Sequence, residues 1–418
     1  MTPDIQAKNG IIDLYLRHCF NTSGITLRHF LWLVFALSNV AFAIDPTEHL
    51  AELSRTCWAT RDGAPADGGT IAQSADGTLW LGSSRGLYRF DGEHFELFTL
   101  PDGTTPITTD VSALYASNNG WLWVGMRFGQ AYSIHDGVLR AYGPQDGLPT
   151  HSVWQFAQRD DGTVWVQTTV GLFLLRGDKW EAVGADWGYP SRQGWSLLTD
   201  RNGALWSYTT GGAFVLRREA NKFERLAAPG GIGELFSAPN GDVWVADHQS
   251  GLINLSHPEQ RISGRLLGGS DAATDAGIFD RDGGLWVSID RGNVGALARF
   301  PNAARELANA APNLAGIQIL KQPDNRCDLD APHFLEDREG NLWVPAGGGV
   351  LRFRDNKLHS AMPDLPAPID NPTMTVDAAG TVWLLGWRSV AQFAPGRNDP
   401  ITLEHAPMMG KRPSALWR

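Results

Sequence analysis

The sequence predicts an all-β protein, a β-propeller of four-stranded blades with seven or eight blades in its ring. Two observations support this fold class: a repeat of about forty residues, and a composition with 47 glycines and 17 tryptophans among 418 residues. Glycine supplies the turn conformations that tight hairpins need, and aromatic residues favour strands. Because no amphipathic helical segment separates the repeated units, strands and turns are expected to account for the whole repeat.

Eight copies of the repeat share a Gly-bearing turn, an aliphatic residue and then a tryptophan. The clearest copies are ADGTLWLGSSRGLYRF at 75–90 and DDGTVWVQTTVGLFLL at 160–175. The repeated tryptophans are Trp80, Trp123, Trp165, Trp206, Trp244, Trp286, Trp343 and Trp383. They lie 38 to 43 residues apart, except for an interval of 57 residues around an insertion at 301–322. So regular a spacing is the signature of a repeat architecture, and we expect the insertion to form an exposed loop or a short helix.

Each repeat divides into four short strands. In the second copy these are expected at Val111–Ser117, Leu122–Gly125, Gln130–Ile134 and Val138–Tyr142, with Gly-bearing turns between them. Four strands in about forty residues match one propeller blade, and the tryptophan of the second strand is expected to fill the wedge between neighbouring blades. A parallel β-helix also repeats, but its coils are shorter and lack paired hairpin turns.

The N-terminal 43 residues are predicted to be a secretory signal peptide. Residues 30–43 read FLWLVFALSNVAFA, which is shorter than the roughly 20 apolar residues needed to span a bilayer. The run ends in Ala41-Phe42-Ala43, with small residues where a signal peptidase would cut. A start codon assigned too far upstream would explain the polar residues 1–24. We therefore expect export to the periplasm and a propeller domain over residues 44–412.

Both ends of that domain resemble parts of a repeat. The segment TCWATRDG at 56–63 is similar to the end of a unit, which predicts an N-terminal strand that completes the last blade. Residues 413–418 (PSALWR) are similar to the first strand of a unit and are interpreted as the start of an incomplete ninth repeat. The chain is therefore expected to be the front part of a longer protein. Either all eight copies close one ring, or seven do and the eighth begins another.

Two cysteines, Cys57 and Cys327, lie within the predicted domain. Two distant cysteines do not make a disulfide framework, so we expect two separate buried thiols. A bridge is the alternative if ring closure brings the chain ends together in an oxidising compartment.

The repeat resembles that of a known family. The segment DGTLWLGSSRGLYRFDGEHF at 76–95, the loop QDGLP at 145–149 and the lead-in WATRDGAP at 58–65 are similar to the propeller repeats of bacterial two-component regulators. This resemblance implies a periplasmic ligand-sensing domain, usually of two seven-bladed rings followed by a β-domain, a membrane helix and a histidine kinase or diguanylate cyclase output. It also implies a possible dimer through the full-length sensor. No output motif is found in this chain, so we expect a non-catalytic input domain.

The candidate site residues are few. The acidic residues of the turns are interpreted as turn chemistry, so no catalytic residue, metal or cofactor is predicted. Trp187, Trp195 and His248 are the candidates for contacting a small-molecule or glycan ligand, because exposed aromatic residues often form binding platforms. The net charge of −10 and the lack of a basic block make nucleic acid an unexpected partner.

Two alternative functions stay open. The chain could be a free-standing periplasmic binding propeller. It could also be an enzyme similar to the streptogramin lyases, which are seven-bladed propellers with a similar turn and which use an acid–base histidine and Mg²⁺. The lyase interpretation requires a histidine near carboxylates at the ring centre. The candidates His151, His248 and His333 are dispersed in the sequence.

Overall fold

The structure is a computed structural model, and it describes residue 44 and residues 49–190, 193–262, 273–290, 295–308, 316–321, 327, 333–355, 373–377, 381–385, 389–393 and 401–404. The predicted signal peptide and the incomplete ninth repeat at 413–418 lie outside these residues. The chain forms two compact units, residues 1–355 and 356–418, and each is described by itself. Among the described residues, no helix is long and apolar enough to cross a membrane.

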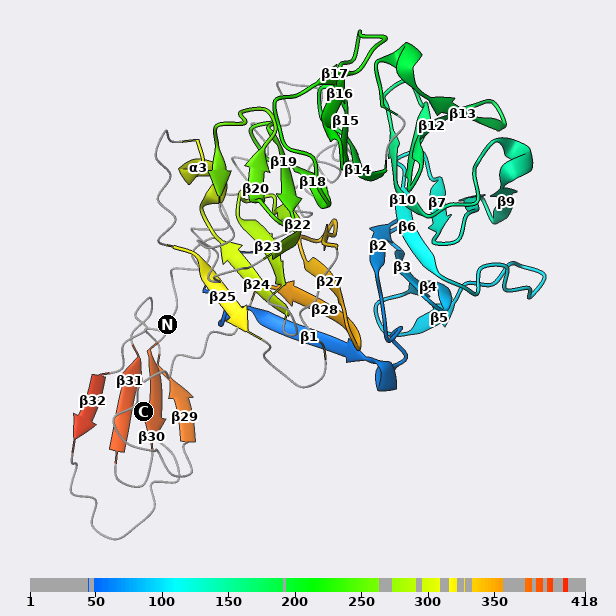
Figure 1. The fold of residues 1–418 in the computed structure, drawn as a ribbon. Helices are drawn as coiled ribbons and strands as arrows, with labels where there is room; N and C mark the ends of the chain where they lie inside the picture. Colours follow the sequence, from blue (N-terminus) through cyan, green and yellow to red (C-terminus); the bar gives the residue numbers. More distant parts are fainter. Residues whose placement is uncertain are drawn as a thin grey trace, which may run out of the picture. The chain divides into compact units, whose positions relative to one another are not determined.

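In the described part of the first unit, seven four-stranded antiparallel sheets form a ring (Figure 1). Blades are numbered in chain order, and the first strand of each lies nearest the ring centre. The first blade consists of β2 (Thr70–Gln73), β3 (Leu79–Ser83), β4 (Gly86–Phe90) and β5 (Phe95–Leu97). The second consists of β6 (Val111–Ala116), β7 (Leu122–Met126), β8 (Ala131–His135) and β9 (Val138–Tyr142). The third consists of β10 (Val153–Gln158), β11 (Val164–Thr168), β12 (Gly171–Arg176) and β13 (Lys179–Val183). The strands predicted for the second copy are therefore confirmed to within about one residue at most ends.

The remaining blades follow the same order along the chain. The fourth blade consists of β14 (Gly194–Thr199), β15 (Leu205–Thr209), β16 (Gly212–Leu216) and β17 (Glu224–Arg225), and the fifth of β18 (Gly233–Ser237), β19 (Val243–Asp247), β20 (Gly251–Asn254) and β21 (Arg261–Ile262). The sixth consists of β22 (Ala273–Phe279), β23 (Leu285–Asp290), β24 (Gly295–Phe300) and β25 (Gln318–Lys321). The seventh consists of β26 (Leu335–Glu336), β27 (Leu342–Ala346), β28 (Gly349–Arg354) and β1 (Ser54–Ala59). Helical structure in the described chain is confined to single turns: η1 (Thr60–Asp62), η2 (Pro144–Asp146), η3 (Ala185–Trp187) and α3 (Ala303–Glu306).

The seventh blade closes the ring with a strand from the other end of the chain. β1 pairs antiparallel with β28, and Cys57 lies opposite Leu351 (Figure 1). Trp343 and Val350 of this blade share a buried cluster with Ile71 of the first blade. The prediction that an N-terminal strand completes the last blade is therefore confirmed, and the ring has seven blades. This closure replaces the two exposed edges of an open sheet array with packed interfaces.

The eighth copy of the repeat lies in the second unit. Its strands β29 (Thr373–Val376), β30 (Val382–Leu385), β31 (Ser389–Phe393) and β32 (Ile401–Glu404) form their own four-stranded antiparallel sheet. Of the two arrangements that the sequence left open, the structure has the one in which seven copies close the ring and the eighth starts a further unit.

Ring closure also joins the two cysteines. Cys57 and Cys327 form a disulfide between residues 270 positions apart, with a Cα–Cα distance of 6.4 Å. The expectation of two separate thiols is wrong, because β1 carries Cys57 back to the seventh blade, where Cys327 is buried. A cross-link over so long a stretch of chain restricts the unfolded state strongly.

The second-strand tryptophans form much of the core between blades. Trp123, Trp165, Trp244, Trp286 and Trp343 are each at most 4% exposed. In the fourth, sixth and seventh blades a carboxylate six residues before the tryptophan accepts the indole N–H, at 2.8 Å for Asp200, 2.9 Å for Asp280 and 2.6 Å for Asp337. The second oxygen of each accepts a backbone N–H of the same turn. These aspartates fix the hairpin and orient the indole at once, so their role is structural.

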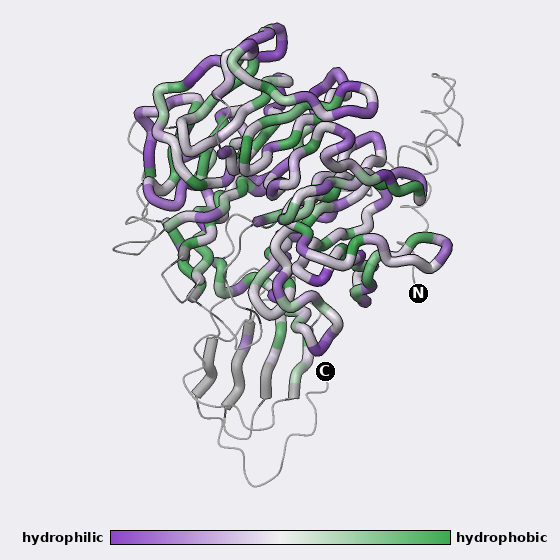
Figure 2. Tube along the Cα trace, turned by 45° about the vertical axis from the view of Figure 1, so that its right-hand side comes forward, coloured by the Kyte–Doolittle hydropathy of each residue, from purple (hydrophilic) through white to green (hydrophobic). Residues whose placement is uncertain are grey.

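The hydropathy of the chain follows this packing. Figure 2 shows apolar colour along strand segments and hydrophilic colour at the turns of the first unit. The insertion at 301–322 contributes the short helix α3 and all of β25, with its middle residues outside the described part of the chain. The expected short helix is present, but Ala303 at its start is fully buried in the core of the sixth blade, not exposed.

Candidate functional site

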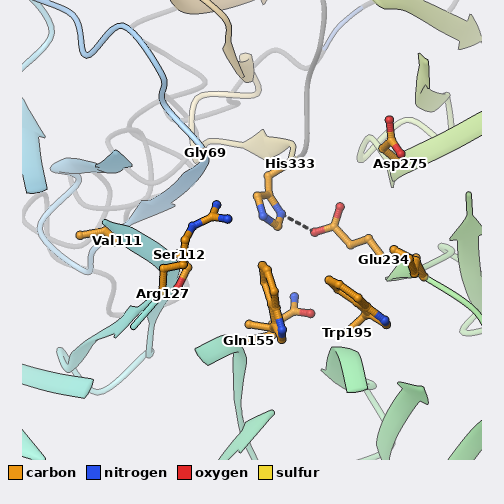
Figure 3. Close-up of a pocket in the computed structure, with 12 residues that line it drawn as sticks. Gly69, Val111, Ser112, Arg127, Gln155, Trp195, Glu234, Asp275 and His333 are labelled. Atoms are coloured by element: carbon orange, nitrogen blue, oxygen red, sulfur yellow. Dashed lines mark hydrogen bonds and ion pairs between the residues drawn. The ribbon is translucent and has the colours of Figure 1, made fainter. Parts of the chain in front are cut away.

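A pocket at the ring centre collects residues from all seven blades. It has a volume of about 300 Å³. Its lining residues lie at or just before the beginnings of the first strands, or in the turn between β7 and β8: Gly69, Val111, Ser112, Arg127, Trp154, Gln155, Trp195, Ile232, Gly233, Glu234, Asp275 and His333 (Figure 3). Because each first strand begins on the same face of the ring, side chains some forty residues apart in sequence converge there.

The turns between second and third strands also lie on this face. The N–H of Arg127 donates to the carbonyl of Asp110 at 2.9 Å, and the N–H of His248 donates to the carbonyl of Ile232 at 2.9 Å. Each bond ties a turn to the segment that enters a first strand. The backbone therefore holds Arg127 and His248 at the mouth of the pocket, on loops that a rigid scaffold positions.

Two tryptophans and an arginine form one wall of the pocket. The rings of Trp154 and Trp195 are 4.8 Å apart between centroids. The Arg127 guanidinium lies 5.8 Å from the Trp154 centroid, a favourable cation–π distance. Among the described residues, both indole N–H groups are buried without a hydrogen-bond acceptor, and no carboxylate forms an ion pair with Arg127. The wall therefore offers aromatic surface and positive charge to a bound molecule, and two unused donors are buried behind it.

Two histidine–carboxylate pairs occupy the other side. His333 Nδ1 lies 2.7 Å from Glu234 Oε1, and His248 Nδ1 lies 2.8 Å from Asp275 Oδ1. Figure 3 shows the first pair pointing into the pocket, with Arg127 on the other side of His333 from Glu234. Burial lowers the pKa of His333, but the charge and hydrogen bond of Glu234 outweigh this effect and raise it above its usual value. Glu234 Oε2 is buried and has no partner among the described residues.

The structure separates the three residues that the sequence singled out. Trp195 lines the pocket, and His248 lies beside it, paired with the lining residue Asp275. Trp187 lies elsewhere: in η3 it packs edge-on against Trp165, with centroids 5.6 Å apart, as part of the core between the third and fourth blades.

Sequence reasoning did not select Arg127, Trp154, Glu234, Asp275 and His333 as ligand contacts. A usable signal exists in retrospect, because most of these residues occupy the first few positions of a first strand in their repeat. In the residues that the structure describes, no group of three or more His, Cys, Asp or Glu side chains is arranged to hold a metal ion.

Comparison with solved structures finds the same fold in two bacterial extracellular domains. The extracellular domain described for hybrid two component system BT3049 from B. thetaiotaomicron is similar with a TM-score of 0.60 and 16% identity, over 84% of this chain and 49% of that one. The corresponding domain of BT4673 from the same organism has a TM-score of 0.56 and 17% identity, over 86% of this chain and 48% of its own. This chain thus spans about half the length of these domains.

A second kind of propeller is also similar. A streptogramin B lyase has a TM-score of 0.55 and 15% identity, over 74% of this chain and 100% of the lyase. No protein-family model matches the chain, and no curated protein matches it in sequence. At these identities the likeness shows the fold alone, so the class of protein is a seven-bladed β-propeller.

Proposed function

We propose that this chain is an exported, non-catalytic ligand-sensing propeller that binds a small polar ligand in the central pocket. The observation that carries the proposal is the convergence of Arg127, the unpartnered indole N–H groups of Trp154 and Trp195, and the unpartnered oxygen of Glu234. Small-molecule sites combine an apolar wall with a few convergent polar groups, as here. The guanidinium on one side and the carboxylates on the other favour a ligand with an anionic group and a separate hydrogen-bond donor.

Two further observations support the location and role. The Cys57–Cys327 disulfide is typical of an oxidising compartment such as the periplasm. The similar Bacteroides domains are extracellular parts of signalling systems. Because such domains are about twice as long as this chain, coupling to an output kinase or cyclase belongs to the proposal and requires parts beyond the propeller described here.

The test is a thermal-shift screen of the purified chain against amino acids, small organic acids and acidic sugars. A ligand that binds the folded state alone raises the melting temperature as its concentration rises. A hit should be lost in Arg127→Gln and weakened in Trp195→Ala. It should persist in Arg85→Gln, a matched control in the equivalent turn of the first blade that lies outside the pocket lining. Hits indifferent to Arg127, or none at all, would contradict the proposal.

A second candidate function rests on the histidine–carboxylate pairs. His333–Glu234 and His248–Asp275 place two potential acid–base groups at one mouth of the ring, which is the arrangement that the lyase interpretation requires. Incubation with a streptogramin B antibiotic, followed by chromatography of the ring-opened product, distinguishes the two functions. Ring opening that disappears in His333→Ala or His248→Ala would favour the enzyme, and an intact substrate would leave the binding function.

A further inference from the structure

A second cavity lies between the second and third blades, on the face opposite the central pocket. Its volume is about 600 Å³, within the range of roughly 300–1,000 Å³ typical of small-molecule sites. Its rim includes Asn119, Asp136, Gly162 and Asp178, which belong to the turns after first and third strands. The central pocket opens at the starts of the first strands, so the two cavities share no residue.

One face of the second blade forms most of this cavity. Cross-strand pairing puts Trp123 opposite Ser133, Ser133 opposite Arg140, and Ala131 opposite Tyr142. Because side chains alternate between the two faces of a sheet, Trp121, Trp123, Ser133, His135, Val138, Arg140 and Tyr142 all project to the same side. Gln158, Val164 and Leu175 of the third blade supply the facing wall.

At one position of the cavity lining the second blade has a small residue where the other blades of the ring have a larger one. The residue opposite the repeated tryptophan on the third strand is Arg89, Leu174, Val215, Asn254, Arg299 or Arg352 in the other blades of the ring. In the second blade it is Ser133. In the sixth and seventh blades the arginine covers the indole face, at 5.3 Å for Arg299 over Trp286. Ser133 is smaller than all of these and fills less of the space beside Trp123, although it is itself fully buried.

Beneath the surface of the cavity lie hydrogen-bonding atoms that the protein does not use. Trp123 Nε1, Ser133 Oγ and His135 Nδ1 are buried atoms without a partner in the described part of the chain. Trp123 is only 4% exposed, and Ser133 is 0% exposed. Leaving such a group unsatisfied costs about 1–3 kcal/mol, so a molecule that both donates and accepts hydrogen bonds at this place is favoured.

The walls and the rim indicate the chemistry of that molecule. Trp121, stacked on His135 at 4.5 Å, and Tyr142 provide flat apolar surfaces. At the rim Arg140 pairs with Asp178, and Asp136 lies 3.4 Å from the His135 ring nitrogen. The basic and acidic groups are therefore largely matched within the protein, which disfavours a charged ligand. Donors at the floor, carboxylates at the rim and aromatic walls suit a ring with several hydroxyl groups, since each hydroxyl donates and accepts.

From these observations we infer that the cleft between the second and third blades is a second binding site, specific for an uncharged hydroxylated ring of monosaccharide size. Small shifts of the surrounding side chains let the ligand's oxygens accept from Trp123 Nε1 and Ser133 Oγ. Its hydroxyls donate to His135 Nδ1 and to the rim carboxylates, and its C–H face lies against aromatic surface. The site is independent of the central pocket and of the ligand proposed there.

The test uses the full chain and methyl α- and β-glycosides of glucose, galactose, mannose and N-acetylglucosamine. Binding is followed by tryptophan fluorescence and saturation-transfer NMR at glycoside concentrations up to about 100 mM. Such concentrations are needed because a dissociation constant of about 1 mM for a single sugar corresponds to a binding free energy of only about 4 kcal/mol. At least one glycoside should saturate. Ser133→Val, which introduces the residue type found at the same position of the fourth blade, should weaken its binding at least tenfold while the protein stays folded.

Two control variants establish which cavity holds the sugar. Ser237→Val makes the same substitution at an exposed strand position outside both cavities, and Arg127→Gln alters the central pocket; both should leave glycoside binding unchanged. The inference is overturned if no glycoside saturates, or if binding survives Ser133→Val and is lost in Arg127→Gln. The latter result would place the sugar in the central pocket.

Discussion

Trp286 of the sixth blade and Trp123 of the second occupy the same position of the repeat, yet their surroundings differ. Trp286 donates its indole N–H to Asp280 at 2.9 Å, and Arg299 covers its ring. Trp123 has Ser117 at the position of Asp280 and Ser133 at the position of Arg299, and its N–H is unpartnered among the described residues. The Trp123 indole therefore lacks both the acceptor and the covering side chain that Trp286 has. Repetition conserves the scaffold while single residues decide whether an interface is closed or can receive a ligand.

The largest effect on stability is expected from removing the aspartate that accepts the Trp286 indole N–H. Asp280→Ala removes the acceptor of both the Trp286 indole and the Gly284 backbone N–H, which stay buried, so we expect a loss of about 3 kcal/mol in the free energy of unfolding. Ser117→Ala at the equivalent position of the second blade removes the hydrogen bonds of Ser117 Oγ to Asn119 and Trp121 within the turn, but none to the indole, and should cost about 1 kcal/mol. Urea unfolding of both variants measures the difference. Equal losses would mean that the aspartate does not hold the indole.

A smaller effect is expected from the tryptophans themselves. Trp286→Phe loses ring volume and leaves Asp280 with a missing donor, whereas Trp123→Phe loses ring volume alone. We expect losses of about 2 and about 1 kcal/mol, respectively, in urea unfolding. If Trp123→Phe proved the more damaging, its N–H would have a partner in solution, and the case for an unused donor would fail.

Filling the cavity should make the two blades more alike. Ser133→Val adds apolar volume above Trp123 and is expected to stabilise the protein by about 1 kcal/mol, as cavity-filling changes commonly do. The reverse substitution, Val215→Ser in the fourth blade, removes packing at a fully buried position and should be destabilising. Thermal unfolding followed by circular dichroism measures both changes. A destabilised Ser133→Val would indicate that the volume above Trp123 is already filled.

The smallest effect on stability is expected from the histidine–carboxylate pair of the central pocket, His333 and Glu234. Because Glu234 raises the pKa of His333, this pair contributes stability that is fully present below about pH 6.5 and is lost as the pH rises through the raised pKa of the folded state. The contribution should be below about 1 kcal/mol, since the pair is partly exposed. Glu234→Gln should remove this part of the pH dependence of unfolding, and an unchanged profile would argue against the ion pair.

Much of the fold was predictable because it depends on local patterns. The Gly-bearing turns and the regular tryptophans identified four-stranded blades, and the second copy, Val111 to Tyr142, was divided correctly. The similarity of TCWATRDG to the end of a unit predicted the closing strand. Such features need only nearby residues, since a hairpin turn and the alternation of a strand are set within a few positions.

The candidate sites were less predictable. Trp195 was selected along with Trp187, although the first lines the central pocket and the second packs against Trp165. Nothing local separates them, because burial is decided by neighbours from other blades. Glu234 and His333 are 99 residues apart in sequence and meet because their strands begin at one end of a narrow ring. The cavity beside Trp123 was missed because it lies between two blades, and no motif within one repeat records how neighbouring blades pack.

By itself, the sequence determined the blade, the number of copies and the strand that completes the last sheet, since each rests on short-range turn chemistry and strand alternation. The tertiary structure decided that seven copies close the ring, that Cys57 meets Cys327, and which side chains face the two cavities. Ring closure brings distant segments together at positions that depend on how every blade packs on the next. No single repeat contains this information, because it depends on all the interfaces between blades.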